Sequence, residues 1–132
     1  MPLKKKIDYT EVQGDYTPES GMKATAEAME HAVKPTAIVY DNDLMAIAGC
    51  RQLEMMGYDV PGDVSVVAWD DSFECRISLP SITAIDHDLL GSSAEAADLL
   101  MKVVAGKRVA SSKNELWTMV KRQSTARVNS AL

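Results

Sequence analysis

The sequence predicts a single α/β domain in which a parallel sheet is flanked by helices. Short, apolar, β-branched stretches alternate with longer segments of helical spacing, and this order is typical of a parallel sheet. The clearest strand is 64–69, because a run that is apolar almost throughout suits a strand covered on both faces. A length of 132 residues allows one domain with a substantial core but is small for two.

The composition narrows the class of protein. Hydrophobic residues make up 46% and charged residues 25%, as in soluble globular proteins. The net charge of -5 argues against a phosphate-binding surface, which would be basic. We expect no membrane contact and no signal peptide. Cys50 and Cys75 show no pairing or metal-ligand spacing, so we expect free thiols in a reducing compartment, the cytoplasm.

The first third of the chain predicts two strands and a helix. Residues 7–12 alternate loosely and predict a first strand. Thr17 is a suitable N-cap, and Pro18 suits the first helical position. Residues 36–40 predict a second strand. The helix between these strands has an apolar stripe formed by Met22, Ala26, Met29 and Val33.

A second helix is predicted over 44–56. The cluster 41–43 provides capping side chains, and Gly57 suits the left-handed position that ends a helix. Because this helix is apolar on two sides, we expect one side to pack on the sheet and the other to meet a partner chain. The two sides are Met45, Gly49, Leu53 and Met56, and Leu44, Ile47, Arg51 and Met55.

The last part of the chain predicts two more strands and a long helix. Residues 72–81 predict a loop, and 82–85 a short fourth strand. Residues 89–105 have helical spacing and are followed by Gly106, a suitable helix end. Residues 116–120 predict a final strand.

Two carboxylates follow the central strand, where ligands of open α/β sheets bind. Asp70 and Asp71 are adjacent, so on an extended backbone their side chains point in opposite directions. They therefore cannot face each other as an acid/base pair. One could accept hydrogen bonds from ligand hydroxyls while the other caps the following loop. The spacing equally allows both to be loop caps.

Other polar residues follow neighbouring strands. Asn42 either caps the second helix or contributes to a polar rim beside Asp70. Tyr16 either offers an aromatic face to a ligand or is a surface residue in a turn. His87 has no second histidine near it in the sequence, which gives a metal site little support. Nucleophile elbows and glycine-rich phosphate loops are absent from the sequence, so we expect neither an enzyme nor a cofactor.

Three segments carry a resemblance to a known family. They are PTAIVYDNDLMA from Pro35, GYDVPGDVSVVAWDD from Gly57 and LPSITAI from Leu79. In this order and spacing they resemble the lactose/galactose-repressor family of bacterial transcription regulators, and the resemblance runs from Gly14 to Thr125. It implies a periplasmic-binding-protein-like type I fold with two lobes. Sugars or nucleobases bind between such lobes and change the affinity of an N-terminal helix-turn-helix for operator DNA.

The resemblance implies a set of ligand-binding residues. Asp70 matches the aspartate that hydrogen-bonds effector hydroxyls, and Asn42 the asparagine at the cleft. Tyr16 falls where the family often has an aromatic residue against the sugar. His87 and Leu89 fall where side chains close over the ligand.

The resemblance also implies a dimer. Family dimers use the helix that carries Ile47 and Arg51 and the loop near Ile77.

One departure from the family pattern concerns the residue before Trp69, where the family often has glycine and this chain has Ala68. The bulky Trp69 therefore leaves the class of effector open.

By resemblance, residues 1–132 are a fragment of the C-terminal lobe of an effector-binding and dimerisation domain. We expect the DNA-binding headpiece and the N-terminal lobe to be missing, and effector binding to be weak. The helix at 88–106 packs, in the family, on the N-terminal lobe. Exposed strand edges and an unpacked helix predict a homodimer or an oligomer swapped through 86–106.

The function expected is the effector-binding and dimerisation portion of a bacterial transcriptional regulator. The effector is a sugar or a related small polar molecule. One alternative is a solute-binding protein of a sugar transport system, which shares the fold. A second is a small α/β hydrolase, which would need turnover that depends on Asp70.

Overall fold

The computed structural model describes residues 7–111 and 117–128 and contains one four-stranded sheet. The sheet order is β1-β2-β3-β4, with β1 parallel to β2 and β2 parallel to β3. The predicted α/β fold is therefore confirmed. One strand differs, since β4 runs antiparallel to β3. The strands are β1 (Ala37–Tyr40), β2 (Ser65–Trp69), β3 (Thr83–Asp86) and β4 (Thr118–Val120).

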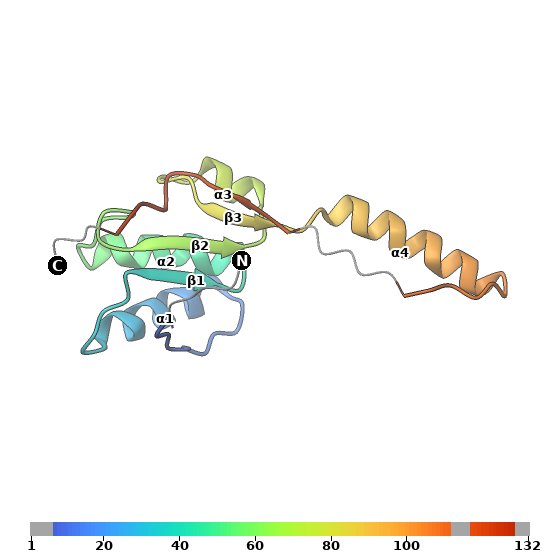
Figure 1. Cartoon of the computed structure of the whole chain (residues 1–132). Helices are drawn as coiled ribbons and strands as arrows, with labels where there is room; N and C mark the ends of the chain where they lie inside the picture. The colour runs from blue at the N-terminus through green and yellow to red at the C-terminus, as the bar shows by residue number, and fades with distance from the viewer. Residues whose placement is uncertain (1–6, 112–116, 129–132) are drawn as a thin grey trace.

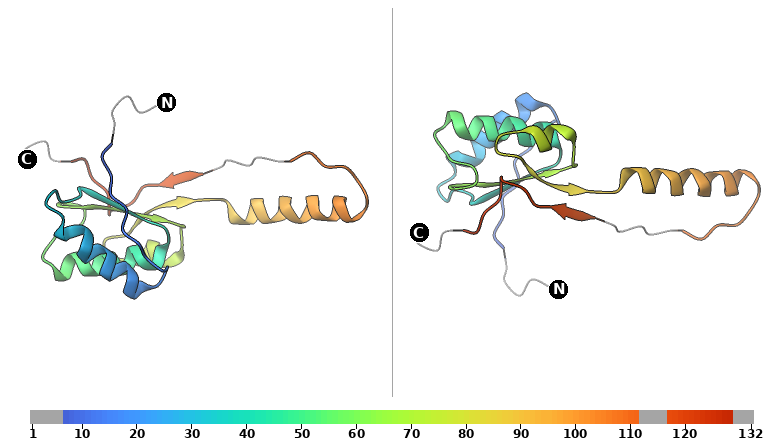
Figure 2. Two further views of the ribbon diagram at one scale, coloured as in Figure 1. Left: turned by 90° about the horizontal axis from the view of Figure 1, so that it is seen from below. Right: turned by 90° about the horizontal axis from the view of Figure 1, so that it is seen from above.

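Three of the four helices lie on one side of the sheet (Figures 1 and 2). The expectation that the central strand is buried on both faces is consequently wrong. Val66 and Ala68 of β2 are buried, whereas Val67 and Trp69 on its other face are partly exposed. The helices are α1 (Pro18–Glu30), α2 (Asp43–Met55), α3 (Phe73–Ile77) and α4 (Leu89–Val104).

Two predicted segments differ from the structure. Residues 7–12 form no strand, and their apolar side chains Ile7 and Tyr9 are exposed. The segment 72–81, expected as a loop, contains α3. Ser72 caps this short helix, because its side-chain oxygen accepts a hydrogen bond from the Cys75 amide at 3.2 Å.

The core lies between α1, α2 and the sheet. Gly21 allows α1 to approach α2 closely, since a Cβ atom there would lie 2.7 Å from the Met45 backbone. The side-chain oxygens of Thr25 in α1 and Tyr40 in β1 share a buried hydrogen bond of 2.6 Å. The buried cluster consists of Met29, Tyr40, Met45, Ala46, Leu53, Val64, Val66, Ala68, Cys75, Ile82 and Ala84.

The segment after β4 holds together the amino-terminal ends of β2 and β3. Ser124 is buried, and its hydroxyl donates to the Val66 carbonyl at 2.6 Å and accepts from the Thr83 amide at 2.8 Å. Its backbone also bonds the Val66 amide and the Ser81 carbonyl. These four hydrogen bonds extend the sheet although the segment is not a strand.

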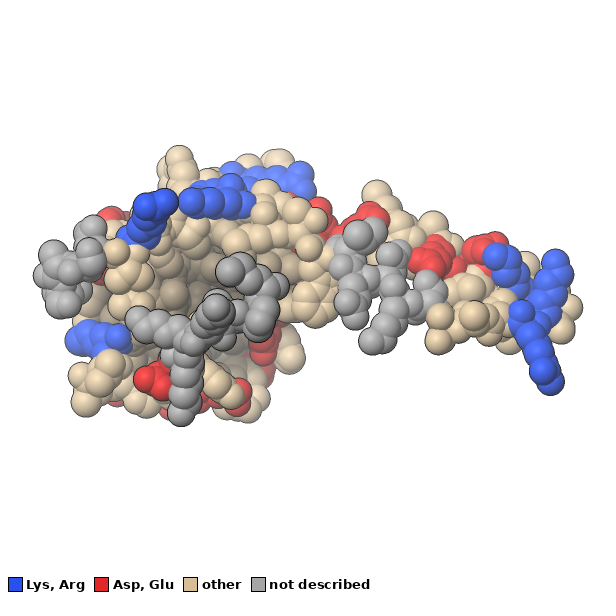
Figure 3. All heavy atoms as spheres, viewed as in Figure 1, with Lys and Arg blue, Asp and Glu red and all other residues tan. Residues whose placement is uncertain are grey.

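The last long helix, α4, projects away from this packed body (Figures 1 and 2). It has no buried residue, and Leu90, Leu100 and Val104 are 88%, 62% and 73% exposed. Figure 3 shows basic side chains at its far tip and acidic side chains nearer the body. The assignment of 88–106 to a second lobe stays a prediction.

Candidate functional site

A hollow of about 420 Å³ opens at the carboxyl ends of β1 and β2, lined by Tyr16, Asp41 and Trp69. The hollow is open to solvent, and its location is where open α/β sheets bind ligands. The hollow combines two aromatic rings with one carboxylate. Such a lining suits a ligand that has a flat apolar face and hydrogen-bond donors.

Asn42 joins two walls of this site. Its side-chain oxygen accepts from the Met45 amide at 2.8 Å, so it is the N-cap of α2. Its side-chain nitrogen donates to the Tyr16 carbonyl at 2.9 Å. The capping interpretation is therefore correct, and the same side chain also fixes the loop that carries Tyr16.

The loop before α1 is held by its own hydrogen bonds. An Asp15 carboxylate oxygen accepts from the amide of Thr17 at 3.1 Å and from its hydroxyl at 2.5 Å. The hydrogen bond from the Thr17 hydroxyl is the main cause that lowers the pKa of Asp15. Tyr16 is thereby held between two anchored neighbours.

Left-handed backbone conformations gather at this edge. The described non-glycine residues with positive φ are Tyr16 (67°), Asp70 (94°) and Asp88 (48°). Such a conformation is unfavourable for a residue with a Cβ, above all for a bulky one, and clusters at functional sites. The sequence resemblance predicts two of these residues, Tyr16 and Asp70, as ligand contacts.

Asp70 and His87 form a pair beside the hollow. His87 Nε2 lies 3.3 Å from Asp70 Oδ1, and the imidazole is 18% exposed while the carboxylate is 48% exposed. The His87 ring also lies 5.4 Å from the Trp69 ring and 5.9 Å from the Trp117 ring. The two tryptophan rings meet edge to face at 5.0 Å. These contacts connect Asp70 to the wall formed by Trp69.

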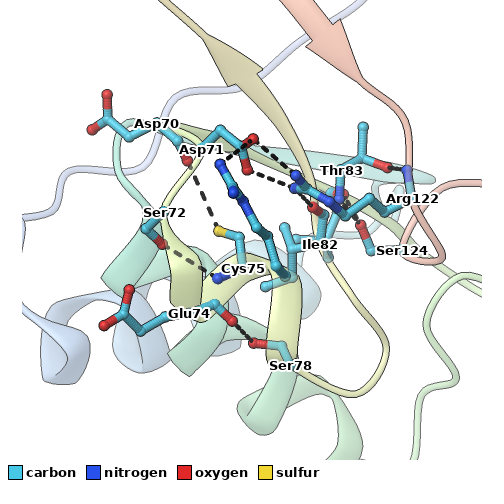
Figure 4. A network of polar contacts seen from close by, with 12 residues as sticks. Asp70, Asp71, Ser72, Glu74, Cys75, Ser78, Ile82, Thr83, Arg122 and Ser124 are labelled. Carbon is cyan, nitrogen blue, oxygen red and sulfur yellow. Dashed lines mark hydrogen bonds and ion pairs between the residues drawn. The ribbon is translucent and has the colours of Figure 1, made fainter. Parts of the chain in front are cut away.

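Asp71 has a structural role on the opposite side of the chain (Figure 4). Its carboxylate lies 2.7 Å and 2.8 Å from the two terminal nitrogens of Arg122 and 3.3 Å from Arg76. The side chain of Asp71 is 6% exposed. The hydrogen bond from Arg122 lowers the pKa of Asp71, and burial opposes this shift.

The two adjacent aspartates therefore point in different directions, as predicted, but neither is a simple loop cap. Asp70 is directed away from the Asp71–Arg122 pair (Figure 4). Asp71 fastens the segment after β4 to the end of β2. Ser72, rather than either aspartate, caps the helix that follows.

The predicted ligand residues lie unequally close to the hollow. Tyr16 lines it, and Asn42 and Asp70 directly follow the lining residues Asp41 and Trp69. His87 contacts Trp69. These four residues thus share one edge of the sheet.

Leu89 is different, because it begins α4, is 69% exposed and is not among the residues that line the hollow. Among the residues expected at a dimer interface, Ile77 and Arg51 are exposed and Ile47 is partly buried. Their binding roles stay predictions.

Several residues of this edge were not selected from the sequence. The sequence assigns no ligand role to Trp69, Trp117 or Arg122, and it places Asp41 only in the 41–43 cluster of capping side chains. The only sequence signal for Trp69 and Asp41 was their place at a strand end. Arg122 lies 51 positions from Asp71, and no local pattern connects them.

Metal and thiol chemistry receive no support from the geometry. Within 7–111 and 117–128, no group of three or more His, Cys, Asp or Glu side chains could hold a metal ion. Cys50 and Cys75 are both free thiols. Burial raises the pKa of Cys50 to about 12 and also raises that of Cys75, so both are poor nucleophiles. None of the described helices is long and apolar enough to cross a membrane.

Comparison with known proteins decides the family. The family of periplasmic binding protein-like domains matches residues 3–125. The chain belongs to this family. It is 35% identical over 118 residues to the HTH-type transcriptional repressor PurR of Salmonella arizonae, covering 87% of this chain and 34% of the repressor. The chain thus spans about a third of the curated repressors it matches.

Solved structures agree with this assignment. A LacI family transcriptional regulator from Bifidobacterium animalis subsp. lactis is 40% identical with a TM-score of 0.84, covering 87% of this chain and 42% of that regulator. The dimeric Lac repressor with an 11-residue C-terminal deletion is 29% identical with a TM-score of 0.80, covering 88% and 43%. The resemblance to the lactose/galactose-repressor family is therefore confirmed.

Proposed function

We propose that this chain is the effector-binding and dimerisation part of a transcriptional regulator. The observation that carries the proposal is the hollow at the ends of β1 and β2, whose lining residues are Tyr16, Asp41 and Trp69. The relatives are transcriptional repressors and regulators. The hollow lies beside Asn42 and Asp70, to which the resemblance assigns effector contacts. The effector is a sugar or a related small polar molecule.

Each residue around the hollow has a separate role in binding the effector. The half-exposed carboxylate of Asp70 accepts hydrogen bonds from ligand hydroxyls, and His87 orients it. Asn42 positions the Tyr16 loop and retains one amide hydrogen and one lone pair for the ligand. Tyr16, which is 62% exposed, covers one face of the ligand. His87 and Leu89 close over it from the start of α4.

Regulation follows as a shift of populations. An effector that binds one arrangement of lobes more tightly shifts the protein toward that arrangement, and its differential affinity limits the size of the shift. The operator is contacted by a helix-turn-helix of the kind named in the relatives. Such a protein acts on DNA in the cytoplasm, and we therefore propose that this protein is cytoplasmic.

Dimerisation uses the second face of α2 together with α3. Leu44, Met55 and Ile77 are 45%, 62% and 61% exposed, although all three are apolar. Ile47 and Arg51 belong to the same face. One solved relative is named as a dimer. Apolar side chains exposed together on one helix face support a protein contact.

Two single substitutions, each of which introduces a negative charge, test the two possible interfaces. Ile77→Glu should dissociate a dimer formed through α2 and α3, whereas Leu100→Glu should dissociate an oligomer swapped through α4. Sedimentation velocity at several concentrations measures both. A wild-type chain that remains monomeric at high concentration contradicts both forms of association.

Effector binding is tested by NMR titration of the whole chain with cellobiose up to 50 mM. We expect weak, saturable shifts of the Tyr16, Asn42 and Asp70 amides with a millimolar Kd. Asp70→Asn should weaken binding about tenfold, because a charge-assisted hydrogen bond is lost. Asp98→Asn on α4 is the matched control and should leave it unchanged. Shifts that map elsewhere, or none at all, contradict the proposal.

A solute-binding protein of a sugar transport system is the second candidate, because it shares the fold. The names of the relatives favour a repressor over it. The genomic reading frame around this sequence separates the two, since a helix-turn-helix indicates regulation and a signal peptide indicates transport. We propose no catalytic role; turnover abolished by Asp70→Asn would indicate one.

A further inference from the structure

We infer that Trp69 and Asp41 select the ligand of the hollow, which accepts a neutral or cationic polyol with one flat apolar face and rejects anions. This inference rests on the proposed function, namely that the hollow binds the effector. It adds two residues to the ligand site, since the family resemblance maps only Tyr16, Asn42, Asp70, His87 and Leu89 to it.

Trp69 forms a fixed aromatic wall. It ends β2, lines the hollow and is contacted by the rings of His87 at 5.4 Å and Trp117 at 5.0 Å. The His87 ring is itself restrained by its pairing with Asp70. A ring held by two neighbours loses little conformational freedom on binding, so stacking on a flat ligand face is pre-organised.

Tyr16 lines the same hollow, and its position is fixed by a different set of contacts. The Asn42 side chain and the Asp15–Thr17 hydrogen bonds hold its loop. Two aromatic residues on independently fixed segments therefore line one hollow. A ligand with a flat apolar face, such as a pyranose ring, fits this arrangement better than an extended polar chain does.

The charged residues at this edge of the sheet determine which net charge a ligand can carry. Of the residues that line the hollow, Asp41 is the charged one, and the carboxylate of Asp70 follows directly after Trp69. The arginines near this edge, Arg76 and Arg122, are both bound to Asp71. Carboxylates accept hydrogen bonds from hydroxyl and ammonium groups and repel phosphates and carboxylates.

Three matched ligands test the selection, namely glucose, glucosamine and glucose 6-phosphate. The side-chain N–H signals of the two tryptophans follow binding by NMR in the whole chain, and Trp117→Phe identifies which signal is which. We expect glucose and glucosamine to shift the Trp69 signal, and glucose 6-phosphate to bind at least tenfold more weakly. Asp41→Asn should narrow this difference at least threefold.

The aromatic wall is tested by Trp69→Leu, which should weaken glucose binding, followed through the Tyr16 and Asp70 amide signals, about five- to tenfold. Trp69→Phe keeps a smaller ring and should weaken it about two- to threefold, so it serves if the leucine variant does not fold. Asp98→Asn on α4, which does not line the hollow, is the control and should change the Kd less than twofold.

The outcomes separate this inference from the proposed function. If glucose 6-phosphate binds as tightly as glucose, or if Trp69→Leu binds glucose like the wild type, the inference is wrong while the hollow still binds an effector. If neither cellobiose nor these three ligands shifts the Tyr16, Asp70 or Trp69 signals, both fail.

Discussion

Two helices of similar character have opposite surroundings in this molecule. The 13-residue α2 buries Met45, Ala46, Ala48, Gly49 and Leu53 against α1 and the sheet. The 16-residue α4 is at least as rich in apolar residues but buries none. A helix of this length is marginal by itself in water, so its stability depends on what covers it. The body is held by its own packing, whereas the described residues bury no side chain of α4.

The largest expected effect separates these two regions directly. Leu53 is 0% exposed, so Leu53→Ala should lower the free energy of unfolding by about 2–5 kcal/mol through lost contacts and a cavity. Leu100→Ala removes the same atoms from a side chain that is 62% exposed and should change it by less than about 0.5 kcal/mol. Urea denaturation followed by circular dichroism measures both. Equal losses would mean that α4 is covered in solution.

The second prediction concerns the ion pair that fastens the segment after β4 to the end of β2. Arg122→Ala leaves the carboxylate of Asp71 with only Arg76, which is 57% exposed. We expect a loss of about 3 kcal/mol in unfolding free energy, because a charge that is 6% exposed loses its main partner. Chemical denaturation at pH 7 measures this loss.

The same pair predicts a pH dependence. The pKa of Asp71 is lower in the folded chain than its ordinary value, so its stabilising effect is present above about pH 4 and is lost as the pH falls through the folded pKa. Unfolding free energies between pH 2 and pH 6 should therefore fall less steeply in Arg122→Ala than in the wild type. Parallel curves would show that Arg122 does not lower this pKa.

Elements that are determined locally were predicted well from the sequence. Thr17, Pro18 and Asn42 mark the starts of α1 and α2 where capping chemistry requires them. Gly57 and Gly106 follow the ends of α2 and α4 with positive φ. Features that depend on distant partners were predicted poorly. The open face of β2, the direction of β4 and the failure of 7–12 to pair all depend on which surfaces the chain brings together.

The candidate site shows the same division. Tyr16, Asn42 and Asp70 could be selected because each lies at the end of a strand or the start of a helix. Trp69 also ends a strand, but the contacts that hold its ring come from His87 and Trp117, which are distant in the sequence and cannot be inferred from local pattern. Leu89 was selected from the family resemblance. Its contact with a ligand needs an arrangement of α4 that local sequence does not determine.

A smaller effect is expected where a single hydrogen bond links α1 to β1. Tyr40→Phe leaves the hydroxyl of Thr25 with only the Gly21 carbonyl and should lower the unfolding free energy by about 1 kcal/mol. Burial raises the pKa of Tyr40 to about 12, so this loss should be the same at pH 7 and pH 9. Thr25→Val gives the complementary measurement, and the double variant should lose less than the sum of the two.

The smallest effect is expected on α4 itself. Lys102 pairs with Asp98 one turn earlier at 2.5 Å, and both side chains are about half exposed or more. Lys102→Ala should change the unfolding free energy of the body by nothing measurable and weaken α4 by at most about 0.3–0.5 kcal/mol. Hydrogen exchange of the α4 amides measures this local change. If Lys102→Ala also speeds exchange in α2, the two regions unfold together, and α4 is then packed on the body or on a second copy rather than free.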